Sequence, residues 1–213
     1  MFLSMLINPF KKPTAVSKVN GRLKIGNSFG RKAVFVGNAP QSGGEFIPMW
    51  SKVVGELSKK GYQFRRCLML GVGGGTAINI LKKRYPKIFI RGVDIDPEIV
   101  NLSLKSKLFQ KDRLNEFEIA DALTWVIKDK QRYDLIVVDL YLGALNPDKA
   151  RQKPFLLQVK SLLKKDGIIL YNCHYQKGHE ADYKVFRGVT DEVFSQVEEI
   201  FIYPKNKILL FTR

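Results

Sequence analysis

The sequence contains a glycine-rich stretch at residues 71–75, directly after a short apolar run. Glycine permits a sharp turn there and lets the main chain approach a ligand without an intervening Cβ. Gly71, Gly73 and Gly75 are therefore candidate ligand contacts. The same stretch is also compatible with a plain strand-to-helix turn, so its meaning depends on the residues that accompany it.

Three aspartates end the apolar runs that follow. Asp94 stands about 20 residues beyond the glycine stretch, where a carboxylate can accept hydrogen bonds from two ribose hydroxyls. Asp121 and Asp139 end the next two runs. Each acid alone could cap a helix, which is the role we expect for Asp96. Three acids and a glycine turn at four successive strand ends instead predict a ligand site along one sheet edge.

Two further side chains are candidates for chemistry near that edge. Tyr141 follows Asp139 by two residues and either lies beside the reacting centre or packs as a loop aromatic. His174 follows the fifth predicted strand and could act as a base near Asp139. A metal site built from Cys173, His174 and His179 lacks a fourth ligand and the usual spacing, so we expect no metal.

The elements that must position these residues alternate between strands and helices. We expect strands at residues 66–71, 88–93, 116–120, 133–139, 168–173, 197–203 and 207–212, and helices at 47–60, 77–84, 97–109, from 122, 150–165 and 181–194. Continuous apolar strands alternating with helices predict a mostly parallel, seven-stranded α/β sheet covered on both faces. The last two strands leave no room for a crossover helix, so the last strand must be antiparallel.

A smaller N-terminal part precedes this alternating region. Residues 16–25 and 31–37 predict a small β-hairpin, followed by a loop rich in glycine and proline at residues 38–45. We therefore divide the chain into an N-terminal segment with the hairpin at residues 1–45 and a Rossmann-like domain at residues 46–213.

Bulk composition narrows the class of protein. The chain has 213 residues, of which 45% are hydrophobic, which suits one sizeable core. No apolar run approaches the roughly 20 residues of a membrane helix, and the two cysteines suggest free buried thiols, so we expect a cytoplasmic protein without a membrane span. The net charge of +16 is spread along the chain, so a nucleic-acid partner stays open without specific support.

The region from 65 to 143 resembles the spermidine synthase family and its relatives of the class I methyltransferase fold. The matching pieces are Leu70-Gly71-Val72-Gly73-Gly74-Gly75, Val93-Asp94-Ile95-Asp96, Asp121-Ala122 and Tyr133-Asp134-Leu135-Ile136-Val137-Val138-Asp139, and Pro40-Gln41-Ser42-Gly43 resembles the family's N-terminal region. The resemblance implies that Asp94 holds the ribose, with Ile95 among the cofactor-binding residues. It also implies that Asp121 and Ala122 hold the adenine and that Asp139 faces the reacting centre. Relatives with such hairpins often dimerise, which leaves a homodimer open.

The departures from the aminopropyltransferases of this family concern acidic residues. Those enzymes carry an aspartate in the glycine loop, which pairs with the amine of decarboxylated S-adenosylmethionine, whereas Gly74 occupies the matching position here. Their Tyr-His pair is replaced in the region of residues 44–50, and the second aspartate after Asp139 is absent. A polyamine is a polycation whose site needs converging carboxylates, so these losses argue against it. The unsubstituted glycine loop suits the methionine carboxylate of S-adenosylmethionine.

The sequence therefore predicts an S-adenosylmethionine-dependent methyltransferase of spermidine synthase-like fold, acting on an unidentified acceptor that we expect to be a small molecule. One alternative is a polyamine aminopropyltransferase that uses decarboxylated S-adenosylmethionine. Another is a catalytically degenerate homologue that binds a nucleoside. A nicotinamide-dependent dehydrogenase is disfavoured because Thr76 replaces the third glycine of that fingerprint.

Overall fold

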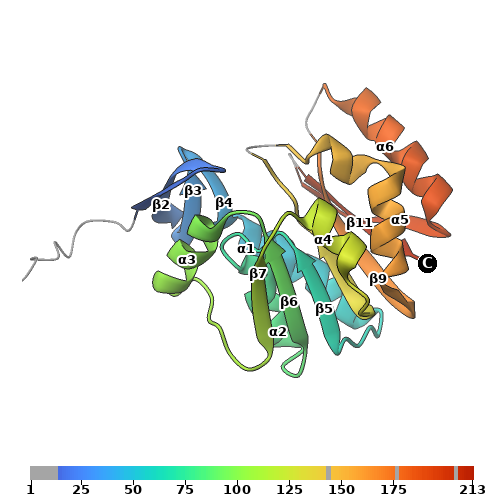
Figure 1. Cartoon of the computed structure of the whole chain (residues 1–213), viewed down its shortest axis with the longest axis horizontal. Helices are drawn as coiled ribbons and strands as arrows, with labels where there is room; N and C mark the ends of the chain where they lie inside the picture. The colour runs from blue at the N-terminus through green and yellow to red at the C-terminus, as the bar shows by residue number, and fades with distance from the viewer. Residues whose placement is uncertain (1–13, 143–144, 176–177, 204–205) are drawn as a thin grey trace, which may run out of the picture.

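A computed structural model describes residues 14–142, 145–175, 178–203 and 206–213, and its largest element is a seven-stranded sheet (Figure 1). From one edge to the other its strands are β10 (Gln196–Tyr203), β11 (Asn206–Thr212), β9 (Leu163–His174), β8 (Tyr133–Val138), β5 (Arg66–Leu70), β6 (Phe89–Asp94) and β7 (Asn115–Ile119). The strands from β9 to β7 pair in parallel, whereas β11 runs antiparallel to both β9 and β10. The predicted sheet with an antiparallel last strand is confirmed.

Helices cover both faces of this sheet, as the apolar strands predict. One face packs against α1 (Phe46–Lys59), α2 (Thr76–Arg84) and α3 (Pro97–Lys105), and the other against α4 (Ala122–Lys128), α5 (Lys153–Ser161) and α6 (Glu180–Val193). Alternate residues of β5 enter the two cores, since Cys67 and Met69 belong to the first and Leu68 and Leu70 to the second. The central strand is therefore buried on both sides.

The order of the strands creates a crevice beside β5. From β5 the chain adds β6 and then β7 on one side, and later places β8 on the other side. At such a reversal the connections leave the carboxyl ends of the two neighbouring strands in opposite directions, and ligands bind in the gap between them. The fold thus directs the ends of β5, β6 and β8 to one place.

The N-terminal part forms a four-stranded antiparallel sheet, larger than the predicted hairpin. Its strands are β1 (Thr14–Ser17), β2 (Gly21–Ser28), β3 (Arg31–Val36) and β4 (Ala39–Gly43). The predicted first strand, residues 16–25, covers the end of β1, the turn after it and the start of β2, and the predicted second strand corresponds to β3. The stretch expected as a loop instead forms β4. Pro40 is tolerated there because β4 is an edge strand that need not donate every main-chain hydrogen bond. In Figure 1 this sheet lies beside α1 and α3.

The predicted helix at residues 150–165 is wrong in its bounds. The structure has a short 3-10 helix, η1 (Asp148–Arg151), and then α5, in which Pro154 occupies the first turn. Proline suits a first turn but disrupts a helix interior, so α5 begins at this point. Strand β9 already starts at Leu163 and shifts register against β8 before Ile168.

The predicted N-terminal segment before residue 14 lies outside the described residues. Within the described ranges, every helix is too short or too polar to cross a bilayer.

Candidate functional site

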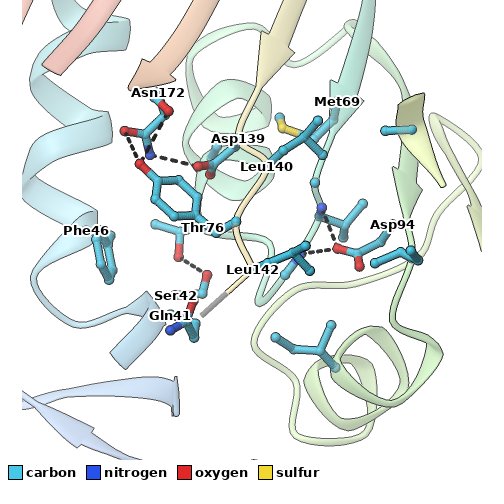
Figure 2. A pocket seen from close by; sticks show the side chains of 18 of the residues that line it. Gln41, Ser42, Phe46, Met69, Thr76, Asp94, Asp139, Leu140, Leu142 and Asn172 are labelled. Carbon is cyan, nitrogen blue, oxygen red and sulfur yellow. Dashed lines mark hydrogen bonds between the residues drawn. The ribbon is translucent and has the colours of Figure 1, made fainter. Parts of the chain in front are cut away.

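A pocket of about 470 Å³ opens at the crevice beside β5. Its walls come from the ends of β5, β6 and β8, from the loop after β7, and from β4 and the start of α1. The predicted site residues that line it are Gly71, Gly73, Asp94, Ile95, Asp121, Ala122, Asp139 and Tyr141. Figure 2 shows Asp94 and Asp139 approaching this pocket from different strands, on either side of Met69 of β5.

One predicted cofactor-binding residue lies away from the pocket lining. Gly75 is not among the residues that line the pocket, and it precedes α2 with a φ of 73°. A Cβ at this position would collide with the ring of Phe109, so Gly75 serves the turn and its packing. His174 ends β9, where its main chain pairs with Asn206, but its side chain lies outside the described part of the structure. Its role as a base stays a prediction.

Asp94 ties the glycine turn to the end of β6. Its Oδ2 accepts hydrogen bonds from the main-chain N–H groups of Val72 and Gly73, both at 2.8 Å, and its Oδ1 accepts one from Asp96 at 2.9 Å. Burial raises the pKa of Asp94, while these three bonds act in the opposite direction. A carboxylate offers about four acceptor positions, so about one remains for a ligand.

Asp121 and its neighbours form another part of the wall. Asp121 Oδ1 accepts a hydrogen bond from the N–H of Leu123 and thereby caps α4. Among the described residues, its Oδ2 accepts no hydrogen bond. Ile95 lines the same pocket and is 44% exposed, although it is a large apolar side chain, and Ala122 lies beside Asp121 in sequence. Together they offer apolar contact and one acceptor oxygen.

Gly71 brings the main chains that follow β5 and β8 into contact. Its φ is 91°, and a Cβ on it would collide with the main-chain oxygen of Asp139. The two segments are joined further by the hydrogen bond from Asp139 N–H to the Leu70 carbonyl. Glycine is therefore required at position 71 by backbone conformation and by this close approach.

Asp139 is held by Asn172, which belongs to a group of buried asparagines at one end of the pocket. The Nδ2 of Asn172 donates to Asp139 Oδ1 at 2.7 Å (Figure 2). The Oδ1 of Asn172 accepts from Asn206 Nδ2 at 2.9 Å and from the Tyr141 hydroxyl at 3.2 Å. Burial raises the pKa of Asp139 to about 6, the bond from Asn172 opposes this rise, and the charge of Asp94 adds to it. Asp139 therefore titrates close to neutral pH.

The N-terminal sheet is fastened to the loops that form the pocket. The Thr76 hydroxyl, at the start of α2, lies 2.7 Å from Ser42 Oγ and accepts a hydrogen bond from Gly43 N–H at 2.6 Å. A side chain at Gly74 would collide with Ser42. Asp96 caps α3, as predicted, and its Oδ2 also accepts a hydrogen bond from Ser17 of β1. The small sheet is thus a wall of the site.

Among the described residues, no group of three or more histidines, cysteines, aspartates and glutamates could hold a metal ion. Cys67 and Cys173 are fully buried, and burial raises the pKa of both thiols. Both thiols are therefore protonated at neutral pH.

Sequence reasoning missed Asn146, Asn206 and Glu45 as pocket or network residues. From the sequence, Asn206 belongs to the turn before the last strand. Glu45 belongs to the region that lacks the Tyr-His pair of the aminopropyltransferases. The available signal was Asn172, a polar residue inside an apolar strand, because a buried amide needs partners.

Comparison with known proteins agrees with the resemblance noted in the sequence. A family model described as a methyltransferase domain matches residues 65–201. A polyamine aminopropyltransferase of Vibrio vulnificus is 26% identical over 134 residues, which are 61% of this chain and 45% of that protein. An eEF1A lysine and N-terminal methyltransferase of Homo sapiens is 28% identical over 117 residues, which are 49% of this chain and 17% of that protein. The match thus spans less than half of either relative.

A solved structure supports the fold. A probable spermidine synthase from Corynebacterium glutamicum superposes with a TM-score of 0.79 at 18% identity, covering 95% of this chain and 80% of that one. At this level of identity the likeness establishes a shared fold. The predicted class I methyltransferase architecture is therefore confirmed, and so is the predicted resemblance to spermidine synthases.

Proposed function

Since the chain belongs to the family of methyltransferase domains, we propose that it binds S-adenosylmethionine in the pocket beside β5 and transfers its methyl group to an acceptor amine. The observation that carries the proposal is the arrival of the glycine turn, Asp94, Asp121 and Asp139 at one pocket. Its volume falls in the range of about 300–1,000 Å³ that is usual for sites of small ligands. S-adenosylmethionine supplies a methyl carbon made electrophilic by the positively charged sulfur to which it is bound.

The pocket residues fit the parts of this molecule. Asp94 has about one acceptor position left, which suits a ribose hydroxyl. Ile95 and Ala122 offer apolar contact to a purine, and Asp121 Oδ2 offers an acceptor for its amino group. The first turn of α2 follows the glycine turn, and its N–H groups favour the methionine carboxylate.

Asp139 is the proposed proton acceptor at the reacting end. An acceptor amine that is protonated in water must lose a proton before its lone pair can form a bond to carbon. With a pKa of about 6, Asp139 is ionised at neutral pH and is close enough to that pH to exchange a proton. Tyr141 bonds to the same asparagine as Asp139, so we assign it a supporting role.

The charge of the pocket favours a cationic acceptor. The ionisable acids among the described lining residues are Glu45, Asp94, Asp121 and Asp139, and none of these lining residues is lysine, arginine or histidine. The whole chain nevertheless carries a net charge of +16. An acidic pocket in a basic protein attracts a protonated amine and disfavours a phosphate at the reacting centre. Glu45 adds an acid to those that the motifs of the sequence analysis contain.

Aminopropyl transfer from decarboxylated S-adenosylmethionine is the second candidate. It is supported by the aminopropyltransferase relative and by the same acidic lining, which suits an amine on either substrate. The two candidates differ in the donor, because decarboxylation removes the carboxylate that the start of α2 would bind.

Calorimetric titration with both donors tests the proposal. We expect tighter binding of S-adenosylmethionine, and at least a tenfold loss of its affinity in Asp94→Ala, because that change releases the glycine turn. The control is Asp166→Ala, which alters an exposed aspartate of β9 and should leave the affinity unchanged. Mass spectrometry of a panel of amines incubated with protein and donor then detects the transferred group.

The outcomes separate the candidates. Preference for the decarboxylated donor would replace the first candidate with the second. Tight binding without transfer to any amine would leave a nucleoside-binding homologue. Absence of binding to either donor by the folded wild-type protein would refute both transferase candidates.

A further inference from the structure

The asparagines behind Asp139 come from three separate segments of the chain. Asn172 lies on β9, Asn206 begins β11, and Asn146 lies in the loop before η1. All three are buried, with side chains 3–6% exposed. Buried amides of this kind cost free energy unless their donors and acceptors are satisfied, so their arrangement is informative.

The hydrogen bonds of Asn206 determine whether the Oδ1 or the Nδ2 of Asn172 faces Asp139. Asn206 Nδ2 donates both to Asn172 Oδ1 at 2.9 Å and to the Tyr141 hydroxyl at 2.7 Å. Asn172 must therefore turn its oxygen toward Asn206 and its Nδ2 toward Asp139. A reversed Asn172 amide would set one NH₂ group against another, so Asn206 would have to reverse as well.

We propose that Asn172 and Asn206 are positioning residues of the transfer site: Asn206 fixes the orientation of the Asn172 amide, and this amide holds Asp139 Oδ1 so that the carboxylate stays available to the acceptor. The role of Asp139 as a proton acceptor rests on the proposed function. The hydrogen-bond chain from β11 to Asp139 is independent of it.

The electrostatic surroundings of Asp139 agree with this arrangement. An N–H donor stabilises the carboxylate over the neutral acid, so the bond from Asn172 opposes the effect of burial on the pKa. Asp94 on β6 acts in the other direction through its charge. The Tyr141 hydroxyl lies in the same network, and burial raises its pKa well above the usual value, so it stays neutral. Without the oriented amide, Asp139 would retain its proton to a higher pH.

Carboxyl-carbon NMR titration of the full chain measures the pKa of Asp139 directly, with Asp139→Asn used to assign the signal. We expect Asn172→Leu to raise this pKa by about one unit, which corresponds to the loss of one hydrogen bond to a charged group. Asn206→Leu should raise it by a smaller amount, because Asn172 remains but keeps only the Tyr141 hydroxyl as a donor to its Oδ1. Asn206→Ser, which retains a donor, should return the pKa toward the wild-type value.

Asn115→Ala is the matched control. Asn115 is as buried as Asn206, but it lies on β7, where its Nδ2 donates to the main-chain oxygen of Gln110 and its Oδ1 accepts from Asp112 N–H, apart from the asparagines behind Asp139. The pKa of Asp139 should therefore stay at its wild-type value in this variant. The inference is overturned if Asn206→Leu keeps a native near-UV circular dichroism spectrum and the wild-type pKa, or if Asn115→Ala shifts the pKa as much.

If Asn206→Leu does not fold, the pKa of Asp139 in the two other variants still tests the proposal. It should be near the wild-type value in Asn206→Ser and about one unit higher in Asn172→Leu. An Asp139 pKa in Asn172→Leu equal to that of the wild type would refute the proposal. The NMR measurement needs no substrate, so a protein that fails to bind either donor but shows the expected shifts would refute the proposed function alone.

Discussion

Asp139 makes the stability of the protein depend on pH. Burial raises its pKa from the ordinary value of 3.8 to about 6, so between these values the folded chain holds a proton that the unfolded chain has released. The free energy of unfolding therefore falls as the pH rises through this interval. We expect Asp139→Asn to be more stable than the wild type at pH 8, by up to about 3 kcal/mol, and to lose this advantage near pH 4. Urea denaturation at both pH values measures the difference, and an equal difference at both would contradict the assignment.

At the scale of residues, the sequence predicts the position of a side chain where that position depends only on the end of one strand. Asp94, Asp121 and Asp139 each follow a parallel strand, and parallel strands bring their carboxyl ends to one edge, so their convergence in the pocket could be predicted. The hydrogen-bond partners of Asp139 could not be predicted from the sequence. Asn172 and Asn206 meet through the pairing of β9 with β11, whose register is set by packing across the whole sheet.

At the scale of elements, the contact between β4 and α2 links the small sheet to the glycine turn. Thr76→Val keeps the shape of the side chain but leaves Ser42 Oγ and Gly43 N–H without this partner. We expect a loss of about 1–3 kcal/mol in the free energy of unfolding, together with weaker donor binding. Thermal denaturation and calorimetry measure these effects. Thr124→Val, at an exposed position of α4, is the control, and an equal effect of both changes would argue against a special role for the contact.

The elements themselves were predictable to different degrees. The central strands and their helices follow from long apolar periodic runs, which tertiary packing reinforces. The sequence predicts a loop where β4 lies, because a segment with proline and glycine has low strand propensity and only pairing with β3 makes it a strand. The sequence predicts one helix over residues 150–165, because the apolar spacing continues past Ser161 into β9. Local pattern does not reveal where a helix gives way to sheet pairing.

At the scale of the whole molecule, two tryptophans report on the two cores. Trp50 of α1 belongs to the core that also contains Leu23 and Val34 of the small sheet, and Trp125 of α4 belongs to the core on the opposite face. Both side chains are buried, at 2% and 8% exposure. Because β5 contributes residues to both cores, neither core can be lost without exposing the central strand. This connection argues that the small sheet and the Rossmann-like region unfold together.

Single-tryptophan variants test that cooperativity. We expect Trp50→Phe, which leaves Trp125 as the emitter, and Trp125→Phe, which leaves Trp50, each to unfold in one transition. In each variant the fluorescence midpoint should coincide with the midpoint of far-UV circular dichroism, even if the two variants differ in stability. A Trp50 signal that changes at lower denaturant than the circular dichroism of the same variant would mean that the first core opens separately. The pocket, which has walls from both the small sheet and the large one, would then lose one wall before the Rossmann-like region unfolds.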